Sequence, residues 1–151
     1  MVYGSDESGS WDIYVMDSDG TNRSAVGNAY CEDTCLYPAI SPDGTKVAYS
    51  SNFQVNGTLG NHEIYVTTIG GYCCPIRLTN NAAADMYPEW SPDGTKVVFG
   101  SLRDGNWEIY AASADGQSAP TRLTFDRSSD LDPSWSPDGS QIVFASDRGG
   151  D

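Results

Sequence analysis

Residues 87–97 read Tyr-Pro-Glu-Trp-Ser-Pro-Asp-Gly-Thr-Lys-Val, and two further copies of this pattern occur in the chain. Residues 37–47 read Tyr-Pro-Ala-Ile-Ser-Pro-Asp-Gly-Thr-Lys-Val, and residues 132–142 read Asp-Pro-Ser-Trp-Ser-Pro-Asp-Gly-Ser-Gln-Ile. Self-similarity at a regular spacing is the signature of a repeat architecture. The pattern therefore predicts a repeat protein.

Two shorter markers accompany the copies. An acid followed by Ile-Tyr occurs at 12–14, 63–65 and 108–110, and Arg-Leu-Thr occurs at 77–79 and 122–124, with 23–25 as a degraded first copy. The distance from the tyrosine of Ile-Tyr to the next Ser-Pro proline is 28, 27 and 27 residues (14 to 42, 65 to 92, 110 to 137). From that proline to the following tyrosine it is 23 and then 18 residues (42 to 65, 92 to 110). One loop per unit takes up the length variation, as in repeat folds that carry function on one face.

Each unit is expected to form four short antiparallel strands. The inner strand ends in Ser-Pro-Asp-Gly, a turn in which proline sets the first central φ angle and glycine supplies a left-handed position. The four expected strands are an inner one at 39–41 and 89–91, a second at 46–50 and 96–100, a third at 63–67 and 108–112, and a fourth containing Arg-Leu-Thr. Four such strands in about 45–50 residues make one blade of a β-propeller, so the predicted fold class is all-β.

The ordered set Pro-x-Trp-Ser-Pro-Asp-Gly-Thr-Lys-Val, Asn-Trp-Glu-Ile-Tyr, Asp-Gly and Arg-Leu-Thr resembles the WD-repeat-like β-propeller family typified by TolB. The resemblance covers almost the whole chain. It implies a propeller that is usually six-bladed and non-catalytic and that serves as a platform for protein interactions in the periplasm. Related propellers also cap serine peptidases.

Composition excludes several classes of function. The 151 residues carry 8 Lys+Arg against 21 Asp+Glu, a net charge of −13, and such a chain repels nucleic-acid phosphates. No apolar run approaches the roughly 18 residues that span a bilayer, so membrane insertion is not expected. The first ten residues have neither the basic region nor the apolar stretch of a signal peptide. The aromatic side chains (4 Trp, 9 Tyr, 4 Phe) can build a core, which argues against disorder.

The phase of the repeat places incomplete units at both ends. Residues 2–5 align with 98–101 and 143–146, and the 141 residues from Val2 to Val143 make three periods averaging 47. The expected organisation is a partial blade 1–36, blades 37–86 and 87–131, and a partial blade 132–151. Three interpretations stay open: a window of a longer array, self-association in which the strand 133–136 completes the N-terminal blade of another copy, and a stable open stack.

Aromatic side chains recur just before the acid of Ile-Tyr, at Trp11, His62 and Trp107. With Phe53 of the 53–60 insertion, they are candidates for a ligand-binding rim that stacks on a sugar or a peptide proline. The alternative is that they pack between neighbouring blades. His62 is the only histidine, so a histidine-based metal cluster or catalytic triad is not expected.

Two acids, Asp85 and Asp130, lie at one equivalent position ahead of the inner strand, where the first unit has Cys35. This end of the strand is expected near the central channel, where a ring of carboxylates could hold a cation; a solvated acidic rim is the alternative. Residues 17–22 (Asp-Ser-Asp-Gly-Thr-Asn) resemble a Ca²⁺ loop but lack its closing glutamate. Ca²⁺ is thus the only cofactor considered.

The four cysteines are Cys31, Cys35, Cys73 and Cys74. An even number in an acidic, Lys-poor chain suggests disulfides and an oxidising compartment, periplasmic or extracellular. We favour the pairs 31–35 and 73–74 over two longer cross-links. The pair 31–35 has the spacing of a zinc knuckle, but the adjacent pair 73–74 is a poor second one.

The sequence has no Gly-x-Ser-x-Gly elbow, phosphate loop or dinucleotide fingerprint, so we expect no enzyme. The tripeptides 22–24 and 56–58 match the N-glycosylation acceptor pattern. The favoured function is an exported, non-enzymatic interaction module that binds a protein or glycan through the loop face bearing the 53–60 insertion. The alternatives are a structural subunit that self-assembles through incomplete terminal blades and a propeller fragment of a larger serine hydrolase.

Overall fold

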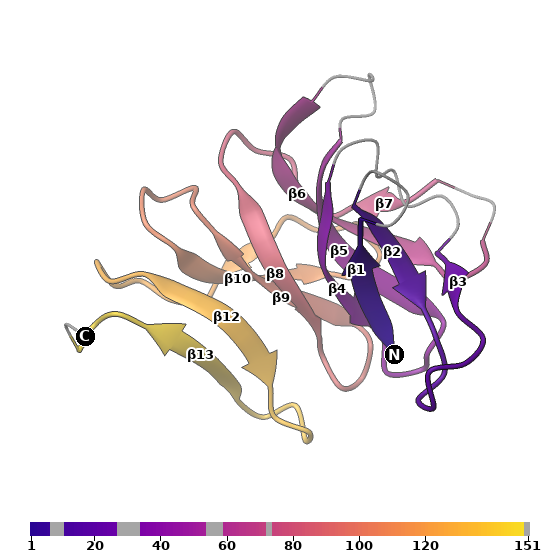
Figure 1. Ribbon diagram of the computed structural model, residues 1–151. Helices are drawn as coiled ribbons and strands as arrows, with labels where there is room; N and C mark the ends of the chain where they lie inside the picture. The colour runs from indigo at the N-terminus through magenta and orange to yellow at the C-terminus, as the bar shows by residue number, and fades with distance from the viewer. Residues whose placement is uncertain (7–10, 27–33, 54–58, 72–73, 150–151) are drawn as a thin grey trace.

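The computed structural model describes residues 1–6, 11–26, 34–53, 59–71 and 74–149. These residues form thirteen strands in four antiparallel sheets and no helix, and so no helix that could cross a membrane. The sheets follow one another side by side in chain order, like an open fan (Figure 1). The predicted all-β, blade-type fold is confirmed.

Two of the sheets have four strands each, ordered along the chain from one edge to the other. One sheet contains β4 (Cys35–Ile40), β5 (Lys46–Phe53), β6 (Leu59–Thr68) and β7 (Ile76–Arg77). The next contains β8 (Asp85–Trp90), β9 (Lys96–Ser101), β10 (Glu108–Ser113) and β11 (Thr121–Arg122). They are flanked by β1 (Val2–Ser5), β2 (Asp12–Val15) and β3 (Ser24–Ala25) on one side, and by β12 (Asp130–Trp135) and β13 (Ile142–Ser146) on the other.

In three of the four sheets the inner strand begins earlier than expected. The sequence places it at 39–41, whereas β4 starts at Cys35 and pairs with β5 through a register shift between Leu36 and Ala39. This β-bulge lets the strand continue past its proline, which cannot donate a ladder hydrogen bond. The same shift occurs in β8 and β12.

The fourth strands are shorter than expected. In Arg-Leu-Thr the strand ends at the arginine, and the leucine N–H still donates to the third strand, as Leu78 does to Ile64 over 2.8 Å. The threonine side chain turns inward. Thr79 donates from Oγ1 to Oε2 of Glu63 over 2.5 Å, and Thr124 makes the equivalent 2.5 Å bond to Glu108. Arg77 and Arg122 then reach the same two glutamates, with nitrogen–oxygen distances of 3.2 and 2.8 Å. Acid-Ile-Tyr and Arg-Leu-Thr are thus two halves of one contact.

The Ser-Pro-Asp-Gly segments form the predicted tight turns. In the second copy, Ser91 Oγ and Thr95 N both donate to Oδ1 of Asp93, over 2.6 and 3.0 Å. Lys96 N donates to Ser91 Oγ over 2.9 Å, and Gly94 takes a φ of 69° that favours glycine. These bonds satisfy the backbone groups of the turn before β9 begins.

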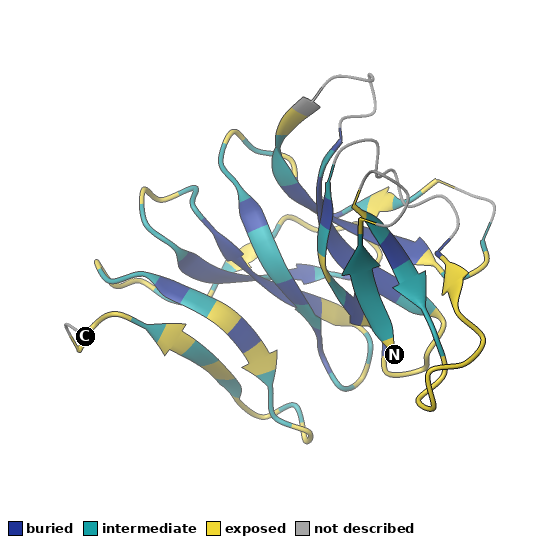
Figure 2. Cartoon of the chain, in the orientation of Figure 1, coloured by how far each residue is buried: buried dark blue, intermediate teal, exposed yellow. Residues whose placement is uncertain are grey.

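The core lies between neighbouring sheets. One cluster joins side chains such as Ile64 and Val66 to Trp90 and Phe99 of the next sheet, and a second joins Ile13 to the β4–β7 sheet. Figure 2 shows the buried residues gathered in the middle of the fan and the exposed ones along its outer strands. Burying each large apolar side chain stabilises the fold by about 1.5–3 kcal/mol, so the sheets hold one another together.

Candidate functional site

Trp11 and Trp107 each lie over a glycine of the neighbouring second strand. A Cβ added to Gly100 would lie 3.4 Å from Cε3 of Trp107, and one added to Gly4 would lie 3.5 Å from Cε3 of Trp11. The first of these glycines also faces Leu131 of the next sheet, at 3.6 Å. The contacts support the packing interpretation for Trp107, whereas Trp11 keeps 42% of its surface exposed.

In the middle unit, His62 takes the tryptophan position, and Ser50 takes the glycine position. The Ser50 hydroxyl lies 3.3 Å from Nδ1 of His62, and burial lowers the pKa of this imidazole. Phe53 does not belong to an exposed rim, because only 8% of its surface is exposed. Its carbonyl accepts a 2.6 Å bond from the Tyr65 hydroxyl within the β4–β7 sheet. Its expected role in ligand stacking is therefore corrected.

The two equivalent acids do not form a ring open to solvent. Asp85 and Asp130 are both fully buried, so the solvated-rim alternative is wrong for them. Arg103 Nη2 donates to both oxygens of Asp85, and Arg148 Nη2 lies 2.9 and 2.8 Å from the two oxygens of Asp130. Each carboxylate is therefore paired with a guanidinium. The expected cation site at these acids stays a prediction.

Sequence reasoning missed these ion pairs, although a signal was present. Each arginine is the third residue of Ser-x-Arg, directly after the second strand. In the β4–β7 sheet, Phe53 takes the place of the arginine and Cys35 that of the aspartate, and both are buried. In this blade two buried residues without charge stand at the positions of the ion pair, and replacing a buried ion pair by apolar residues is often neutral or stabilising.

A row of left-handed residues lies at the bulges of the three inner strands. Tyr37, Tyr87 and Asp132 have φ angles of 53°, 59° and 50°, although none is glycine. Such a conformation costs about 1–3 kcal/mol per residue and persists only where the surrounding structure imposes it. Because bulges re-aim side chains, the same device sets the direction of all three. In the sequence, these three positions can be recognised as the residue directly before the inner-strand proline of each repeat.

The members of this inner row touch one another. The rings of Tyr37 and Tyr87 lie 4.4 Å apart between centroids, and the Tyr87 ring meets Trp107 edge-on at 6.0 Å. A hydrogen bond to Tyr37, with burial and the nearby Asp132 charge, raises the pKa of Tyr87 to about 12. Tyr37 itself keeps 42% of its surface exposed. The row offers neutral aromatic surface beside one carboxylate.

Residues 17–22 form an ordinary turn. Asp19 Oδ1 accepts bonds from the backbone and hydroxyl of Thr21, and Asn22 Nδ2 donates to Asp17 over 2.7 Å. An amide donor turned toward a carboxylate is not arranged for Ca²⁺, which requires oxygen ligands. Across the described ranges, no group of three or more His, Cys, Asp or Glu side chains could hold a metal ion.

Two of the four cysteines, Cys31 and Cys73, lie outside the described residues. Cys35 is fully buried and Cys74 is exposed. The disulfide pairing stays a prediction. Of the two glycosylation tripeptides, 56–58 also lies outside the described part, whereas Asn22 is exposed.

Comparison with known proteins agrees with this geometry. The sequence matches the family described as the TolB beta propeller domain over residues 1–151. A protein assigned as TolB from Agrobacterium tumefaciens is similar with a TM-score of 0.80 and 28% identity, over 96% of this chain and 50% of that one. TolB from Acinetobacter baumannii gives 0.77 and 30%, over 95% and 34%. No curated protein matches the chain.

A puromycin-hydrolysing peptidase from Mycobacterium tuberculosis shares the fold, with a TM-score of 0.65 at 18% identity over 86% of this chain and 22% of that one. The chain spans half or less of the length of the two TolB structures. Repeat by repeat, its turns, inner-strand bulges and sheet order fit one architecture. The chain belongs to the TolB β-propeller family.

Proposed function

We propose that this chain is a non-catalytic propeller module that captures a protein partner on the inner row of Tyr37, Tyr87 and Asp132. The observation that carries the proposal is the left-handed backbone at all three positions. Strained residues that recur at one structural position point to a function, because packing alone rarely selects them.

The chemistry of the inner row suits a protein surface. Tyrosine is enriched at interfaces because it buries a large rigid ring and keeps a hydroxyl for hydrogen bonding. The row is extended by the edge contact of Tyr87 with Trp107, whose ring packs on Gly100. A net charge of −13 favours a basic partner through long-range attraction. By analogy with TolB proteins, we place the module in the periplasm or outside the cell.

Site-specific photo-crosslinking tests the proposal. A photoreactive phenylalanine at position 37 should crosslink one discrete protein in extracts of the source cell, and the same probe at Asp115, on the exposed β10–β11 turn, should not. Tyr87→Ala should abolish the adduct formed at position 37, because the two rings support each other. Equal crosslinking at both positions, or an adduct that survives Tyr87→Ala, would overturn the proposal.

Two alternatives remain proposals and have their own tests. If the chain is part of a serine hydrolase, the parent reading frame contains a catalytic domain. If it self-assembles through its terminal sheets, the sedimentation coefficient rises with protein concentration. Partner capture through the 53–60 loop, which includes residues outside the described part, is tested by deleting that loop while the inner row is kept.

A further inference from the structure

The Ser-Pro-Asp-Gly turns of successive sheets stack into a continuous row. A Cβ added to Gly94 would lie 3.8 Å from Cδ of Pro42, and one added to Gly139 would lie 3.8 Å from Cδ of Pro92. Each turn therefore contacts the turn of the neighbouring sheet. The row lies at the ends of the strands opposite to the β5–β6 and β9–β10 connections, as the strand directions show (Figure 1).

A cavity opens on either side of the central turn. The first, of about 330 Å³, lies between the turn that carries Asp43 and the turn that carries Asp93. The second, of about 410 Å³, lies between the central turn and the turn that carries Asp138. Both cavities include Pro92 and Asp93 in their walls, so they adjoin along the row.

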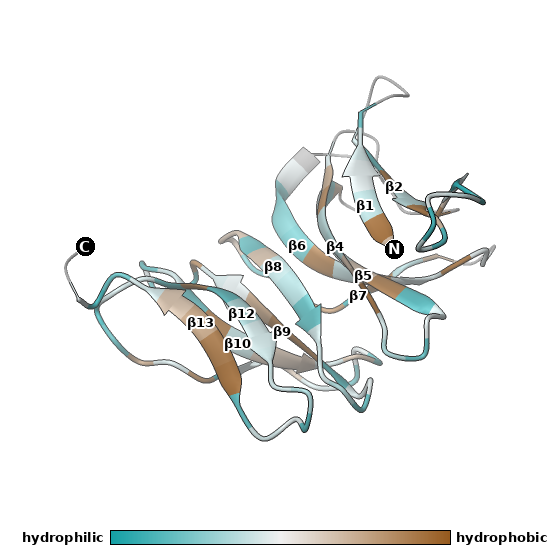
Figure 3. Ribbon diagram, turned by 60° about the horizontal axis from the view of Figure 1, so that its bottom comes forward, coloured by the Kyte–Doolittle hydropathy of each residue, from teal (hydrophilic) through white to brown (hydrophobic). Residues whose placement is uncertain are grey.

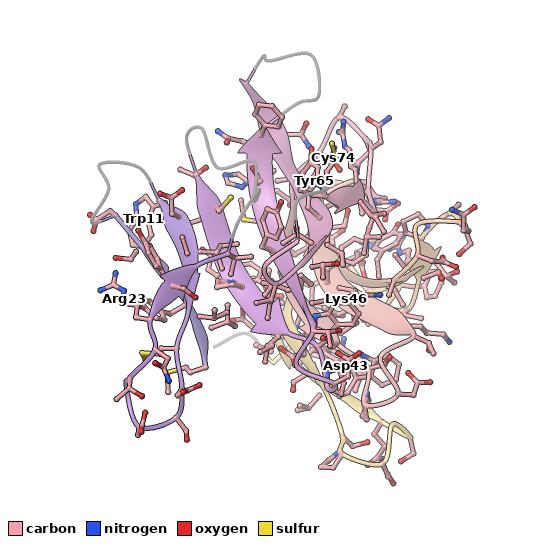
Figure 4. The ribbon with its side chains drawn as sticks, turned by 90° about the vertical axis from the view of Figure 1, so that its right-hand side faces the viewer. Trp11, Arg23, Asp43, Lys46, Tyr65 and Cys74 are labelled. Carbon is pink, nitrogen blue, oxygen red and sulfur yellow. The ribbon has the colours of Figure 1, made fainter. Side chains whose placement is uncertain are left out.

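Both cavities combine a lysine with turn aspartates. Lys46 lines the first cavity and Lys96 the second. Figure 4 shows Lys46 and Asp43 near each other at the β4–β5 turn. Among the described residues, neither lysine has a salt bridge. Hydrogen bonds from the turn serine and threonine lower the pKa of Asp93 to about 2, so this carboxylate is charged at neutral pH.

The second cavity also has an indole N–H without a partner. At the first cavity the equivalent indole N–H has a partner: Trp90 Nε1 donates to the carbonyl of Ala39 over 3.0 Å. The Nε1 atom of Trp135, in the wall of the second cavity, is buried and has no hydrogen-bond partner among the described residues. A buried donor left unpaired costs about 1–3 kcal/mol, and a ligand acceptor would recover that energy once the indole turns to expose its N–H.

We propose that the paired cavities bind a neutral oligosaccharide, with the main contacts at Trp135, Lys96 and Asp93. Charges of both signs line one small space, so the carboxylates repel an anionic ligand and the ammonium repels a cationic one. A hydroxyl group both donates and accepts, so the hydroxyls of a sugar satisfy the carboxylate and the ammonium, and also the indole N–H once it is exposed. The Trp135 ring and Pro92 offer apolar surface to the C–H faces of a sugar. Two adjoining cavities suit a chain of sugars rather than a single one.

This groove is independent of the proposed protein-binding function, because none of its lining residues belongs to the inner row. Protein capture at Tyr37 can therefore fail while sugar binding holds, and the reverse is equally possible.

Nuclear magnetic resonance of the ¹⁵N-labelled full chain tests the proposal, because the indole N–H signal of each tryptophan reports locally. The probes are maltohexaose, cellohexaose and chitohexaose, with acetate and methylammonium as charged comparisons. At least one hexasaccharide should shift the Trp135 indole signal in a saturable way and leave the Trp11 signal unchanged. Lys96→Gln, a surface change that leaves the core intact, and Trp135→Phe, which removes the N–H and keeps a ring, should each weaken the affinity at least about tenfold.

Two matched controls should bind as the unaltered chain does: Asp115→Asn, on another exposed turn, and Trp107→Phe, at the other end of the strands. The proposal is overturned if no hexasaccharide shifts the Trp135 signal up to about 10 mM, where even a weak complex of mM affinity would form. It is also overturned if acetate or methylammonium shifts the signal and the sugars do not, or if Lys96→Gln and Trp135→Phe leave the sugar response intact.

Discussion

Arg103 reaches the carboxylate of Asp85 with Nη2 at 3.2 Å from Oδ1 and 3.0 Å from Oδ2. Asp85 is fully buried and also accepts a 2.7 Å bond from Asn81. The pair fastens the connection after β9 to the start of β8. Because the aspartate has no exposure to water, its charge depends on these partners.

Arg103→Ala should lower the free energy of unfolding by about 3 kcal/mol, because it leaves a buried charge without its counter-ion. Arg148→Ala should cost less, since the Arg148 side chain is 48% exposed against 23% for Arg103 and water can replace part of its interaction. Urea denaturation of both variants measures the difference. Equal losses of free energy in the two variants would mean that burial of the arginine does not determine how much each ion pair stabilises the fold.

The β4–β7 sheet predicts a rescue of that loss. Cys35 and Phe53 occupy there the positions of Asp85 and Arg103. The double change Asp85→Ala with Arg103→Phe should therefore be more stable than the sum of its single changes, by a coupling energy of about 1–3 kcal/mol. A double-mutant cycle in urea measures it, and a coupling near zero would show that the two positions do not interact.

The turn aspartates should make the fold sensitive to acid. Hydrogen bonds from the turn serines and the residues after glycine lower the pKa of Asp43, Asp93 and Asp138 to about 2. An unfolded aspartate titrates near about 3.9, so their contribution is complete above that pH and is lost as the pH falls toward about 2. In Asp93→Asn, the urea midpoint should fall less steeply between these pH values. Ser91→Ala should flatten the slope in the same way, and an unchanged slope in both would assign the acid sensitivity to other carboxylates.

Glu89 should act in the opposite direction. Burial raises the pKa of this carboxyl, although the backbone N–H of Trp90 partly offsets the rise. A carboxyl with a raised pKa favours the folded state below that pKa and loses this contribution as the pH rises through it. Glu89→Ala introduces the residue found at the equivalent position, Ala39. It should raise the melting temperature at pH 7, with a gain in the free energy of unfolding of up to about 1 kcal/mol. The gain should vanish near pH 4; a variant less stable at pH 7 would show that the ionised carboxylate is bound favourably.

Gly100→Val should disturb the inner row indirectly, by displacing Trp107. A side chain at this position would press on Trp107 and Leu131, which lie 3.4 and 3.6 Å from the added Cβ. We expect a loss of about 1–3 kcal/mol and a shifted Trp107 indole signal, despite the preference of valine for strands. Ala145→Val is the matched control, because residue 145 is exposed at the equivalent position of β13 and should tolerate the change. Equal effects would remove the steric explanation.

The sequence determined the local parts of this protein. Ser-Pro-Asp-Gly turns, Ile-Tyr strands and inner strands recur with nearly constant spacing, because turn geometry and strand alternation depend on neighbouring residues. The blade architecture could therefore be predicted from the chain alone. Figure 3 shows hydrophobic residues on the outer strand β13. Val143 of this strand is 68% exposed, so the alternation of residue types does not by itself report burial.

Only the tertiary structure decided which repeated residues are buried and which are exposed. Asp85 and Asp130 resemble surface acids in the sequence, yet packing encloses them with arginines located 18 residues further along. Phe53 resembles a rim residue and is buried instead. The left-handed Tyr37 and Tyr87 could not be predicted either, because their φ angles result from a bulge between paired strands. Burial and strain depend on contacts between sheets, which no local pattern encodes.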